Sequence, residues 1–321
     1  MFASRSSLKA LGVVGMNDRN INLIARHNPR RLFPLVDNKL KTKLLAREHG
    51  LPTPGLIGSL SLQHEVQEIE AIVHDQPGFA IKPATGSGGK GILVIVDRQE
   101  EAFVKGSGAL VDLLHLKRHA SNILSGLFSL GGSPDIVIIE ELIRPDPLYE
   151  DLSVEGVPDL RVIVYRGFPI MAMLRLSTRA SDGKANLHQG AVGVGVCVLS
   201  GKTINAVQFD KQVTIHPDTG ADLHQIQIPD WEELLTLSAR CAEASGLGYL
   251  GVDLVLDINK GPMLLELNAR PGLAIQIANG EGLMPCIRAI DALPPQDFRK
   301  SAQARVAIGK QALAAIVSAR R

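Results

Sequence analysis

Two pairs of long apolar runs, each joined by a short turn, most constrain the fold of this chain. The first pair, DLRVIVYRG and FPIMAMLRL, predicts a β-hairpin that turns near Arg166–Gly167. The second pair, GYLGVDLVLD and GPMLLELNA, predicts a hairpin that turns through residues 259–262. Periodicity and boundary residues predict further strands at 79–83, 91–97 and 135–143, strand structure within 191–199, and helices at 40–49, 61–74 and 231–245. We therefore expect a mixed α/β (α+β) fold, with Ser61 and Asp230 as N-caps of two helices.

The composition excludes several classes of protein. The 321 residues include 34 basic and 33 acidic side chains, and the net charge of +1 gives no electrostatic basis for nucleic-acid binding. The three cysteines are far apart in the sequence, which fits reduced thiols in a cytoplasm better than disulfides or a zinc site. No apolar run is long enough to span a bilayer, and residues 1–17 lack a signal-peptide cleavage site. We therefore expect a cytoplasmic globular protein whose fold starts at the N-terminus.

A glycine-rich loop, TGSGGKG at residues 85–91, lies between two predicted strands. It matches G-x-G-x-x-G, but a dinucleotide-binding fingerprint needs a helix after the loop, and here a strand follows. Gly91 stands where a Walker A loop has Ser or Thr, so that motif is also excluded. Taken alone, the loop is either a plain β-turn or a hairpin tip whose backbone amides bind phosphates.

Two lysines near this loop favour phosphate binding. Lys82 lies in the apolar strand FAIKP, and a lysine is rarely buried without a partner. An ammonium beside an amide-rich loop is a natural point charge for a phosphate. Lys39, in VDNKLKTKLL, is a second candidate, with a solvated lysine at a helix start as the alternative.

Several acids lie in apolar runs. Glu140 and Glu141 lie within the run IIEELI, where backbone groups could meet an adenine edge or two solvated acids could end a strand. In LLELNARPGL, strand alternation puts Glu266, Asn268 and, if the strand persists, Arg270 on one face, with Leu265 and Leu267 on the other. The hairpin can bring Asp253 beside Glu266 and Asn268, a set of oxygen ligands that suits magnesium. The alternative is a buried Glu266–Arg270 ion pair.

The motifs, in order, resemble the ATP-grasp superfamily and within it the RimK-type alpha-L-glutamate ligases. The resemblance extends from about residue 37 to 273 and is nearest to homologues grouped as sugar-transfer-associated ATP-grasp proteins; its pieces are DNKLKTKLLAREHGLPTPG, FAIKPATGSGGKGI, IIEELI, DLRVIVYRGFPIMAMLRL, GKANLHQGA, GVDLVL and LLELNARPGL. It implies an ATP-grasp fold with two αβ subdomains that clasp ATP. The expected parts are a short N-terminal segment at 1–36 (a truncated pre-grasp segment), an N-terminal subdomain with the loop at 37–137, a C-terminal subdomain with the metal site at 138–290, and a helical tail at 291–321.

The resemblance also implies roles for individual residues. Those expected to bind ATP are Lys39, Lys82, the loop residues Gly86, Ser87, Gly88, Gly89, Lys90 and Gly91, the adenine-lining Glu140, Glu141 and Leu142, the ribose-proximal Asp159, and Lys184 and Asn186. Those expected to hold Mg²⁺, with Mn²⁺ as an alternative, are Asp253, Glu266 and Asn268. Those expected to be catalytic, facing the transferring phosphate, the acyl phosphate or a substrate carboxylate, are Arg161, Arg175 and Arg270.

The function implied is an ATP-dependent carboxylate–amine ligase. It would form an amide through an acyl phosphate, adding an amino acid such as glutamate to a small-molecule or peptide carboxylate. Two alternatives stay open: kinase-like phosphoryl transfer to a hydroxyl, and a non-catalytic nucleotide-binding partner protein. RimK-type ligases carry a larger domain ahead of the Lys39 motif, where this chain has fewer than forty residues. This leaves open that a homodimer or a partner chain completes the substrate site. The basic stretch 299–321 predicts an amphipathic helix that packs on its own domain, or else docks a partner.

Overall fold

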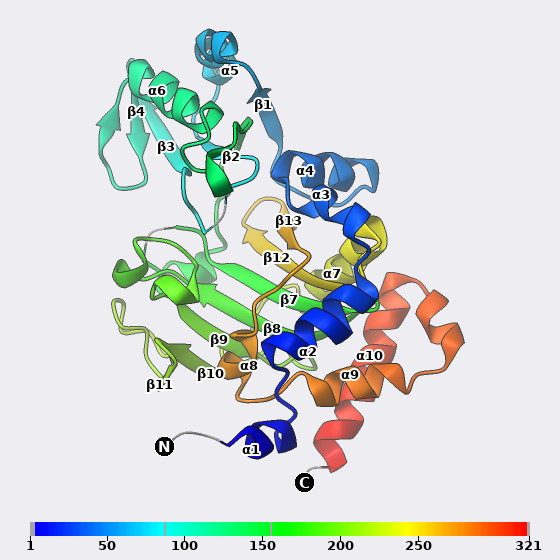
Figure 1. The fold of residues 1–321 in the computed structure, drawn as a ribbon. Coiled ribbons are helices and arrows are strands. Elements are labelled where there is room, and N and C mark those ends of the chain that lie inside the picture. The colour runs from blue at the N-terminus through cyan, green and yellow to red at the C-terminus, as the bar shows by residue number, and fades with distance from the viewer. Residues whose placement is uncertain (1–3, 87, 155, 320–321) are drawn as a thin grey trace. The chain divides into compact units, whose positions relative to one another are not determined.

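The chain divides into two compact units in the computed structural model, which describes residues 4–86, 88–154 and 156–319 (Figure 1). The large unit comprises Met1–Asp37, Leu45–Pro52 and Pro145–Arg321. The small unit comprises Asn38–Leu44 and Thr53–Arg144. Each unit has its own sheet, and in both sheets all neighbouring strands are antiparallel.

The large unit contains a seven-stranded sheet in the order β11-β10-β9-β8-β7-β12-β13. Its strands are β7 (Asp159–Tyr165), β8 (Phe168–Leu176), β9 (Val192–Val196), β10 (Thr203–Gln208), β11 (Lys211–Val213), β12 (Tyr249–Asp257) and β13 (Gly261–Asn268). Both predicted hairpins are confirmed, since β7 pairs with β8 and β12 with β13. Between β7 and β8 the two turn residues, Arg166 and Gly167, have φ of 52° and 85°, the positive values that a type I′ hairpin turn requires.

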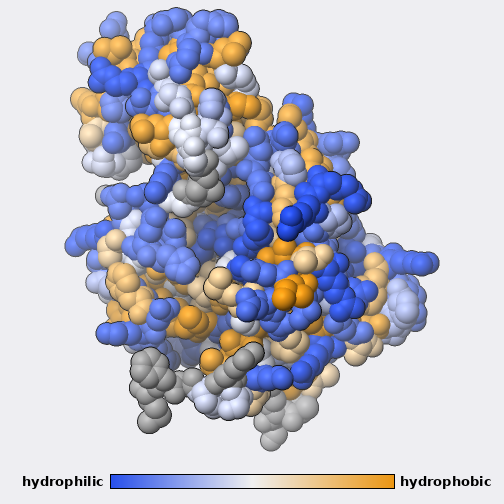
Figure 2. Space-filling model, in the orientation of Figure 1, coloured by the Kyte–Doolittle hydropathy of each residue, from blue (hydrophilic) through white to orange (hydrophobic). Residues whose placement is uncertain are grey.

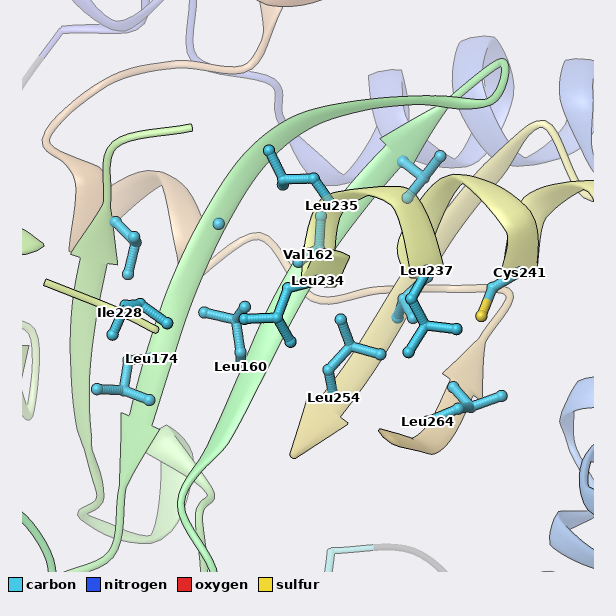
Figure 3. Close-up of a cluster of buried hydrophobic side chains, with 14 of the residues drawn as sticks. Leu160, Val162, Leu174, Ile228, Leu234, Leu235, Leu237, Cys241, Leu254 and Leu264 are labelled. Atoms are coloured by element: carbon cyan, nitrogen blue, oxygen red, sulfur yellow. The ribbon is translucent and has the colours of Figure 1, made fainter. Parts of the chain in front are cut away.

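Apolar side chains cover both faces of this sheet. On one face, α7 (Trp231–Ser245) lies across the strands and buries leucines at helical spacing (Figure 3). Alternate residues of β7 show the two faces, since Leu160 and Val162 pack under α7 whereas Ile163 and Tyr165 belong to a second apolar cluster. Burial on both faces explains why β8 is apolar from Phe168 to Leu174 rather than alternating.

Helices complete the large unit. They include α1 (Arg5–Ala10), α2 (Met16–Asp18), the π-helix η1 (Arg19–Ala25), η2 (Arg30–Leu32), α3 (Phe33–Val36), α8 (Ile275–Asn279), α9 (Met284–Asp291), η8 (Pro295–Arg299) and α10 (Ala302–Ala319), with the 3-10 turns η5 (Pro147–Tyr149), η6 (Arg179–Ser181) and η7 (Leu187–Gln189). Helix α10 packs on α7, α9 and β8. Two of its basic side chains pair with α7, Arg305 with Glu243 and Lys310 with Glu232. The basic C-terminal helix therefore packs on its own unit.

The small unit contains a six-stranded sheet in the order β1-β6-β2-β3-β4-β5. Its strands are β1 (Leu56–Leu60), β2 (Phe79–Pro83), β3 (Leu93–Gln99), β4 (Ala102–Lys105), β5 (Leu110–Val111) and β6 (Val137–Glu141), and its helices are α4 (Lys39–Glu48), whose first residues belong here, η3 (Gln63–Glu68), α5 (Ile69–Val73), α6 (Leu113–Leu124) and η4 (Leu130–Gly132). Ile69 of α5 and Leu116 and Ile123 of α6 are buried in one cluster with Phe79 and Ile139 of the sheet.

Three local predictions need correction. The helix expected at 61–74 is a 3-10 turn followed by α5, and Ser61 does not cap it: the Glu65 carboxylate accepts hydrogen bonds from the backbone N–H groups of Ser61 (2.6 Å) and Leu62 (2.9 Å). Asp230 precedes α7, but its backbone is left-handed (φ 49°) and its side chain makes no capping hydrogen bond. The strand expected at 91–97 begins two residues later, at Leu93, because the preceding glycines form the loop.

Hydrophilic and hydrophobic residues are interspersed over both units on the face drawn in Figure 2. Among the described residues, we find no helix with both the length and the hydrophobicity needed to cross a bilayer.

Candidate functional site

The glycine-rich loop of the small unit joins two neighbouring antiparallel strands, as predicted. Ile81 on β2 pairs with Leu93 on β3, so residues 84–92 form the connection of a hairpin. Gly88, Gly89 and Gly91 have φ of 65°, 74° and 75°, a conformation that other residues seldom adopt. The predicted ligand Ser87 lies outside the described residues.

Helix α6 and the segment after it contact the far end of this loop. A Cβ added at Gly91 would lie 2.6 Å from the ring of Phe128, so the ring occupies the space that glycine leaves. The carbonyl oxygen of Gly91 is 3.0 Å from Nε2 of His119, a ring that also contacts Phe128. Burial lowers the pKa of His119, which favours the neutral ring. In that state its Nε2–H can donate to the Gly91 carbonyl.

Lys39 lies at the near end of the loop. Its Nζ donates to the carbonyl of Gly86 (2.6 Å), and its backbone N–H donates to the carbonyl of Ala84 (2.8 Å). The first turn of α4 is thus joined to the start of the loop. Of the predicted phosphate ligands, Lys39 and Gly86 lie together in the small unit, whereas Lys90 is exposed at the loop tip.

Lys82 is buried beside an acid on the neighbouring strand. Only 5% of Lys82 and 2% of Glu140 is exposed, and Lys82 Nζ pairs with Oε1 of Glu140. The register pairs Ala80 with Glu140, which places Glu140 and Lys82 on the same face of adjacent strands. Glu140 is therefore not a solvated acid, and its side chain holds a lysine.

A second lysine, Lys43, completes this cluster and was not predicted from the sequence. Its Nζ lies 2.7 Å from Oε2 of Glu140 and donates to the carbonyl of Pro54 (2.5 Å) and to Oγ1 of Thr53 (3.3 Å). Burial lowers the pKa of Lys43, although Glu140 opposes this. Burial disfavours the charged form of Glu140, but the two lysines outweigh it and hold the pKa of Glu140 below its ordinary value. We call Lys43, Glu140 and Lys82 the lysine cluster.

Glu141 and Leu142 follow at the end of β6. Glu141 and Gly55 exchange two contacts: the N–H of Glu141 donates to the carbonyl of Gly55 (2.9 Å), and Oε2 of Glu141 accepts from the N–H of Gly55 (3.0 Å). The backbone donor of Glu141 is thus already paired within the small unit. Leu142 is half-buried and lies against Gly78.

In the large unit, the predicted metal ligands lie on neighbouring strands. Asp253 pairs with Glu266 across β12 and β13, and Asn268 lies opposite Gly251. The expectation that this hairpin brings Asp253 beside Glu266 is confirmed. The register shifts after Asp253, which makes Leu265 an extra residue on β13 and interrupts the strict alternation that the sequence predicted. Asp253 is buried, whereas Glu266 and Asn268 are half-buried.

Arg270 does not share the face of Glu266. Strand β13 ends at Asn268, whose Oδ1 accepts a hydrogen bond from the N–H of Arg270 (2.8 Å) and turns the chain. The exposed guanidinium of Arg270 pairs with Asp37 (2.6 Å) and lies over the ring of Phe33. Because the strand does not continue to Arg270, the predicted face shared by Glu266 and Asn268 does not include Arg270.

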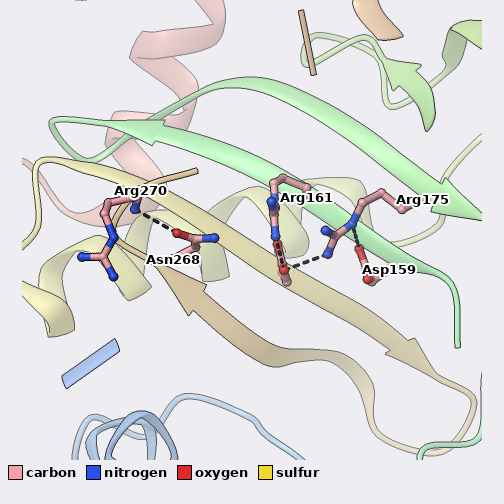
Figure 4. Close-up of polar contacts among 6 residues, drawn as sticks. Asp159, Arg161, Arg175, Asn268 and Arg270 are labelled. Atoms are coloured by element: carbon pink, nitrogen blue, oxygen red, sulfur yellow. Dashed lines mark hydrogen bonds and ion pairs between the residues drawn. The ribbon is translucent and has the colours of Figure 1, made fainter. Parts of the chain in front are cut away.

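Two arginines, Arg161 and Arg175 (both labelled in Figure 4), hold the carboxylate of Asp253. Arg161 donates to both oxygens of Asp253, from Nε and Nη2, at 2.5 Å each. Arg175 donates to Oδ2 of Asp253 (2.7 Å) and to Oδ1 of Asp159 (2.5 Å). The register explains the contacts, because Arg161 pairs with Asp253 across β7 and β12, and Asp159 with Arg175 across β7 and β8. We call Asp159, Arg161, Arg175 and Asp253 the arginine cluster.

The two acids of the arginine cluster have opposite pKa shifts. Burial disfavours the ionised form of Asp253, but Arg161 and Arg175 outweigh it and lower the pKa to about 2. Burial is the main influence on Asp159, and together with repulsion by Asp253 it outweighs Arg175 and raises the pKa to about 6. Among the described residues, no group of three or more His, Cys, Asp or Glu side chains is placed so that it could hold a metal ion.

Lys184 and Asn186 lie in the segment between β8 and β9. Lys184 pairs with Asp182 (2.8 Å), and Oδ1 of Asn186 caps η7 by accepting from the N–H of His188 (3.1 Å). A pocket of about 150 Å³ begins at the residue after Asn186. It is lined by Leu187, His188, Ala191, Val207, Phe209, Asp210, Ala274 and Ile277.

The chain resembles several known proteins. It is 22% identical over 303 residues to the cyanophycin synthetase of Synechocystis sp., covering 88% of this chain and 33% of that protein. It is 25% identical over 236 residues to a probable alpha-L-glutamate ligase of Maridesulfovibrio salexigens, covering 74% of this chain and 56% of the relative. It thus spans about a third to just over half the length of these relatives. The solved D-alanyl-alanine synthetase A of Vibrio cholerae matches with a TM-score of 0.44 and 12% identity, covering 84% of this chain and 64% of that one.

A family model described as sugar-transfer associated ATP-grasp matches residues 18–292. The match includes both sheets, the glycine-rich loop and the two ionic clusters. The ATP-grasp fold expected from the sequence is therefore confirmed, and the chain belongs to the sugar-transfer-associated ATP-grasp family.

Proposed function

We propose that this protein is an ATP-dependent carboxylate–amine ligase that forms an amide bond and releases ADP and phosphate. The observation that carries the proposal is the buried Lys82, held beside a glycine-rich hairpin loop whose start is joined to Lys39. The names of the relatives, a cyanophycin synthetase and probable alpha-L-glutamate ligases, support amide formation. The substrates proposed are an amino acid such as glutamate and a small-molecule or peptide carboxylate.

The nucleotide would be bound chiefly through its phosphates. Lys39, Lys82 and the backbone amides of the loop supply positive charge and short donors, as phosphate binding requires. Because the N–H of Glu141 is paired with Gly55, adenine would be bound by the other backbone groups of Glu141 and Leu142. Asp159, Lys184 and Asn186 remain the proposed contacts for the ribose and the incoming substrate.

The donors on β13 fit a divalent cation. Glu266 and Asn268 are half-buried oxygen donors two residues apart, and Mg²⁺ commonly takes one or two protein oxygens together with waters and nucleotide phosphates. Asp253 is adjacent, but both of its oxygens already accept from Arg161 and Arg175. We therefore propose Glu266 and Asn268 as the principal ligands, with Oδ1 of Asp253, which accepts one hydrogen bond, as a further contact for the cation. Bound Mg²⁺, or Mn²⁺ with the same oxygen preference, would neutralise phosphate charge.

The reaction proposed has two steps. A substrate carboxylate oxygen attacks the γ-phosphorus of ATP, and ADP leaves; the amine nitrogen then attacks the acyl carbon, phosphate leaves, and the amine loses a proton. Arg161 and Arg175 each have N–H groups beyond those bound to Asp253 and Asp159, and these can stabilise charge on the transferring group. Arg270 could reach a substrate carboxylate only by leaving Asp37. The pocket after Asn186 is our candidate for the incoming substrate.

The test is magnesium-dependent ADP release by the purified protein with a panel of amino acids and glutamate-ended peptides, followed by mass spectrometry of the products. Amide formation would support the proposal and identify the amine. A phosphorylated product without an amide would instead support kinase-like transfer, and ATP binding without ADP release across the panel would support a non-catalytic role. A protein that binds no ATP would overturn the proposal.

A further inference from the structure

The lysine cluster contains one acid and two bases, all buried in the small unit. Each of Lys43, Lys82 and Glu140 is less than 9% exposed, and together they carry two ammonium groups and one carboxylate. The half-buried Glu141 also attracts Lys43, so the positive charge left unbalanced lies chiefly on Lys82. A buried excess charge is costly unless a counter-ion is available. The identity of the lysine that remains unbalanced therefore determines where an anion can bind.

The Lys43 ammonium lies against three protein oxygens. It donates hydrogen bonds to the carbonyl of Pro54 (2.5 Å) and to Oγ1 of Thr53 (3.3 Å), and it forms an ion pair with Oε2 of Glu140 (2.7 Å), an oxygen that accepts no hydrogen bond from the described residues. Two of its three N–H groups are thus used by neutral oxygens, and its charge is paired with Glu140. Lys43 is therefore poorly suited to bind a ligand itself.

Lys82 differs from Lys43 in this respect. The contact that the structure gives its ammonium is with Oε1 of Glu140, which uses one donor of three. Because Lys43 holds the second oxygen of the same carboxylate, Lys82 shares the charge of Glu140 instead of neutralising it alone. The result is a lysine fixed in position that still carries excess positive charge.

We propose that Lys43 is a positioning residue for nucleotide binding: it balances the charge of Glu140, so that Lys82, held by the same carboxylate, stays available to a phosphate anion. This inference rests on the proposed function, because it assigns Lys82 to the phosphates of a nucleotide. Lys43 lies one helical turn after Lys39, so the same end of α4 contacts the loop through one lysine and the carboxylate through the other.

The experiment is a double-variant cycle of Lys43→Met and Glu140→Gln, with ADP and inorganic tripolyphosphate as probes in titration calorimetry. We expect Lys43→Met to weaken binding of both probes about tenfold, about 1.4 kcal/mol, because Glu140 then neutralises Lys82. Adding Glu140→Gln removes that competing charge and should restore binding to within about twofold of the Glu140→Gln protein. A residue that only supports packing would give additive losses instead. Lys41→Met, at an exposed position of the same helix, is the matched control and should bind as the unaltered protein does.

The outcomes separate this inference from the proposed function. If the unaltered protein binds neither probe, the nucleotide assignment is wrong and the inference is wrong with it. If it binds both and Lys43→Met binds equally well, only the inference is overturned. Should Lys43→Met not fold, the double variant is compared with Glu140→Gln alone, since both lack the acidic charge. Equal affinities there support the proposal, and a tenfold further loss on removing Lys43 contradicts it.

Discussion

The lysine cluster of the small unit and the arginine cluster of the large unit differ in their charge balance. The former has two lysines around one carboxylate, whereas the latter has two arginines and two aspartates. In both clusters, cross-strand register brings side chains of adjacent antiparallel strands together, and in the lysine cluster helix α4 adds Lys43. The excess charge of the lysine cluster suits a permanent anion site. In the arginine cluster the charges are balanced. An anion such as a phosphate can therefore bind there only by replacing Asp253 as the partner of an arginine.

The largest expected effect concerns Glu266, which lies beside the arginine cluster. Glu266→Ala should abolish magnesium-dependent ADP formation, because a principal oxygen donor for the cation is lost. The protein should stay folded, since Glu266 is only half-buried. Steady-state kinetics with a thermal unfolding control would check this, and unchanged turnover would remove Glu266 from the metal site.

A second variant breaks the arginine cluster itself. Asp253→Ala leaves two buried arginines without their shared carboxylate and should lower the free energy of unfolding by about 3–5 kcal/mol. Denaturant unfolding would measure this. Asp253→Asn, which keeps the shape and removes the charge, is the companion variant. A loss below about 1 kcal/mol for the alanine variant would mean that the arginines find other partners.

The third prediction concerns how the stability of the protein depends on pH through Glu140 of the lysine cluster. The pKa of Glu140 lies below its ordinary value of 4.5 in the folded protein, so Glu140 contributes stability that is present above pH 4.5. That contribution is lost as the pH falls through the folded-state pKa. Unfolding free energies measured from pH 7 to pH 3 should therefore fall less steeply below pH 4.5 for Glu140→Gln than for the unaltered protein. Parallel curves would contradict the lowered pKa.

The smallest effect on stability is expected at Arg270. Its ion pair with Asp37 is exposed, and such pairs contribute less than about 1 kcal/mol. Arg270→Ala should thus leave the free energy of unfolding nearly unchanged. Turnover measured on the same protein decides its role: a loss of activity without a loss of stability would support substrate contact, and full activity would remove Arg270 from the catalytic set.

Local features of the chain were predictable from the sequence, and contacts between distant segments were not. The hairpins and the Asp253–Glu266 pairing follow from apolar runs and a turn within about twenty residues. The partner of Arg270 is 233 positions away, at Asp37, and no local pattern indicates it. Lys43 was missed because it resembles its neighbour Lys41 in sequence, and only the packing of α4 buries one and exposes the other. Asp230 has the composition of an N-cap, but its left-handed backbone directs the side chain elsewhere.

The way the two units are built from the chain also bears on the order of folding. Every strand of the small sheet lies between residues 56 and 141, so this sheet can form before most of the large unit has been synthesised. Val14 and Leu23, by contrast, pack with Tyr249, more than two hundred residues later. Strand β7 likewise acquires one neighbour at once, in β8, and the other only when β12 emerges. Until then, the apolar side chains of the N-terminal segment stay uncovered, and such exposed apolar segments are prone to aggregate or to bind chaperones.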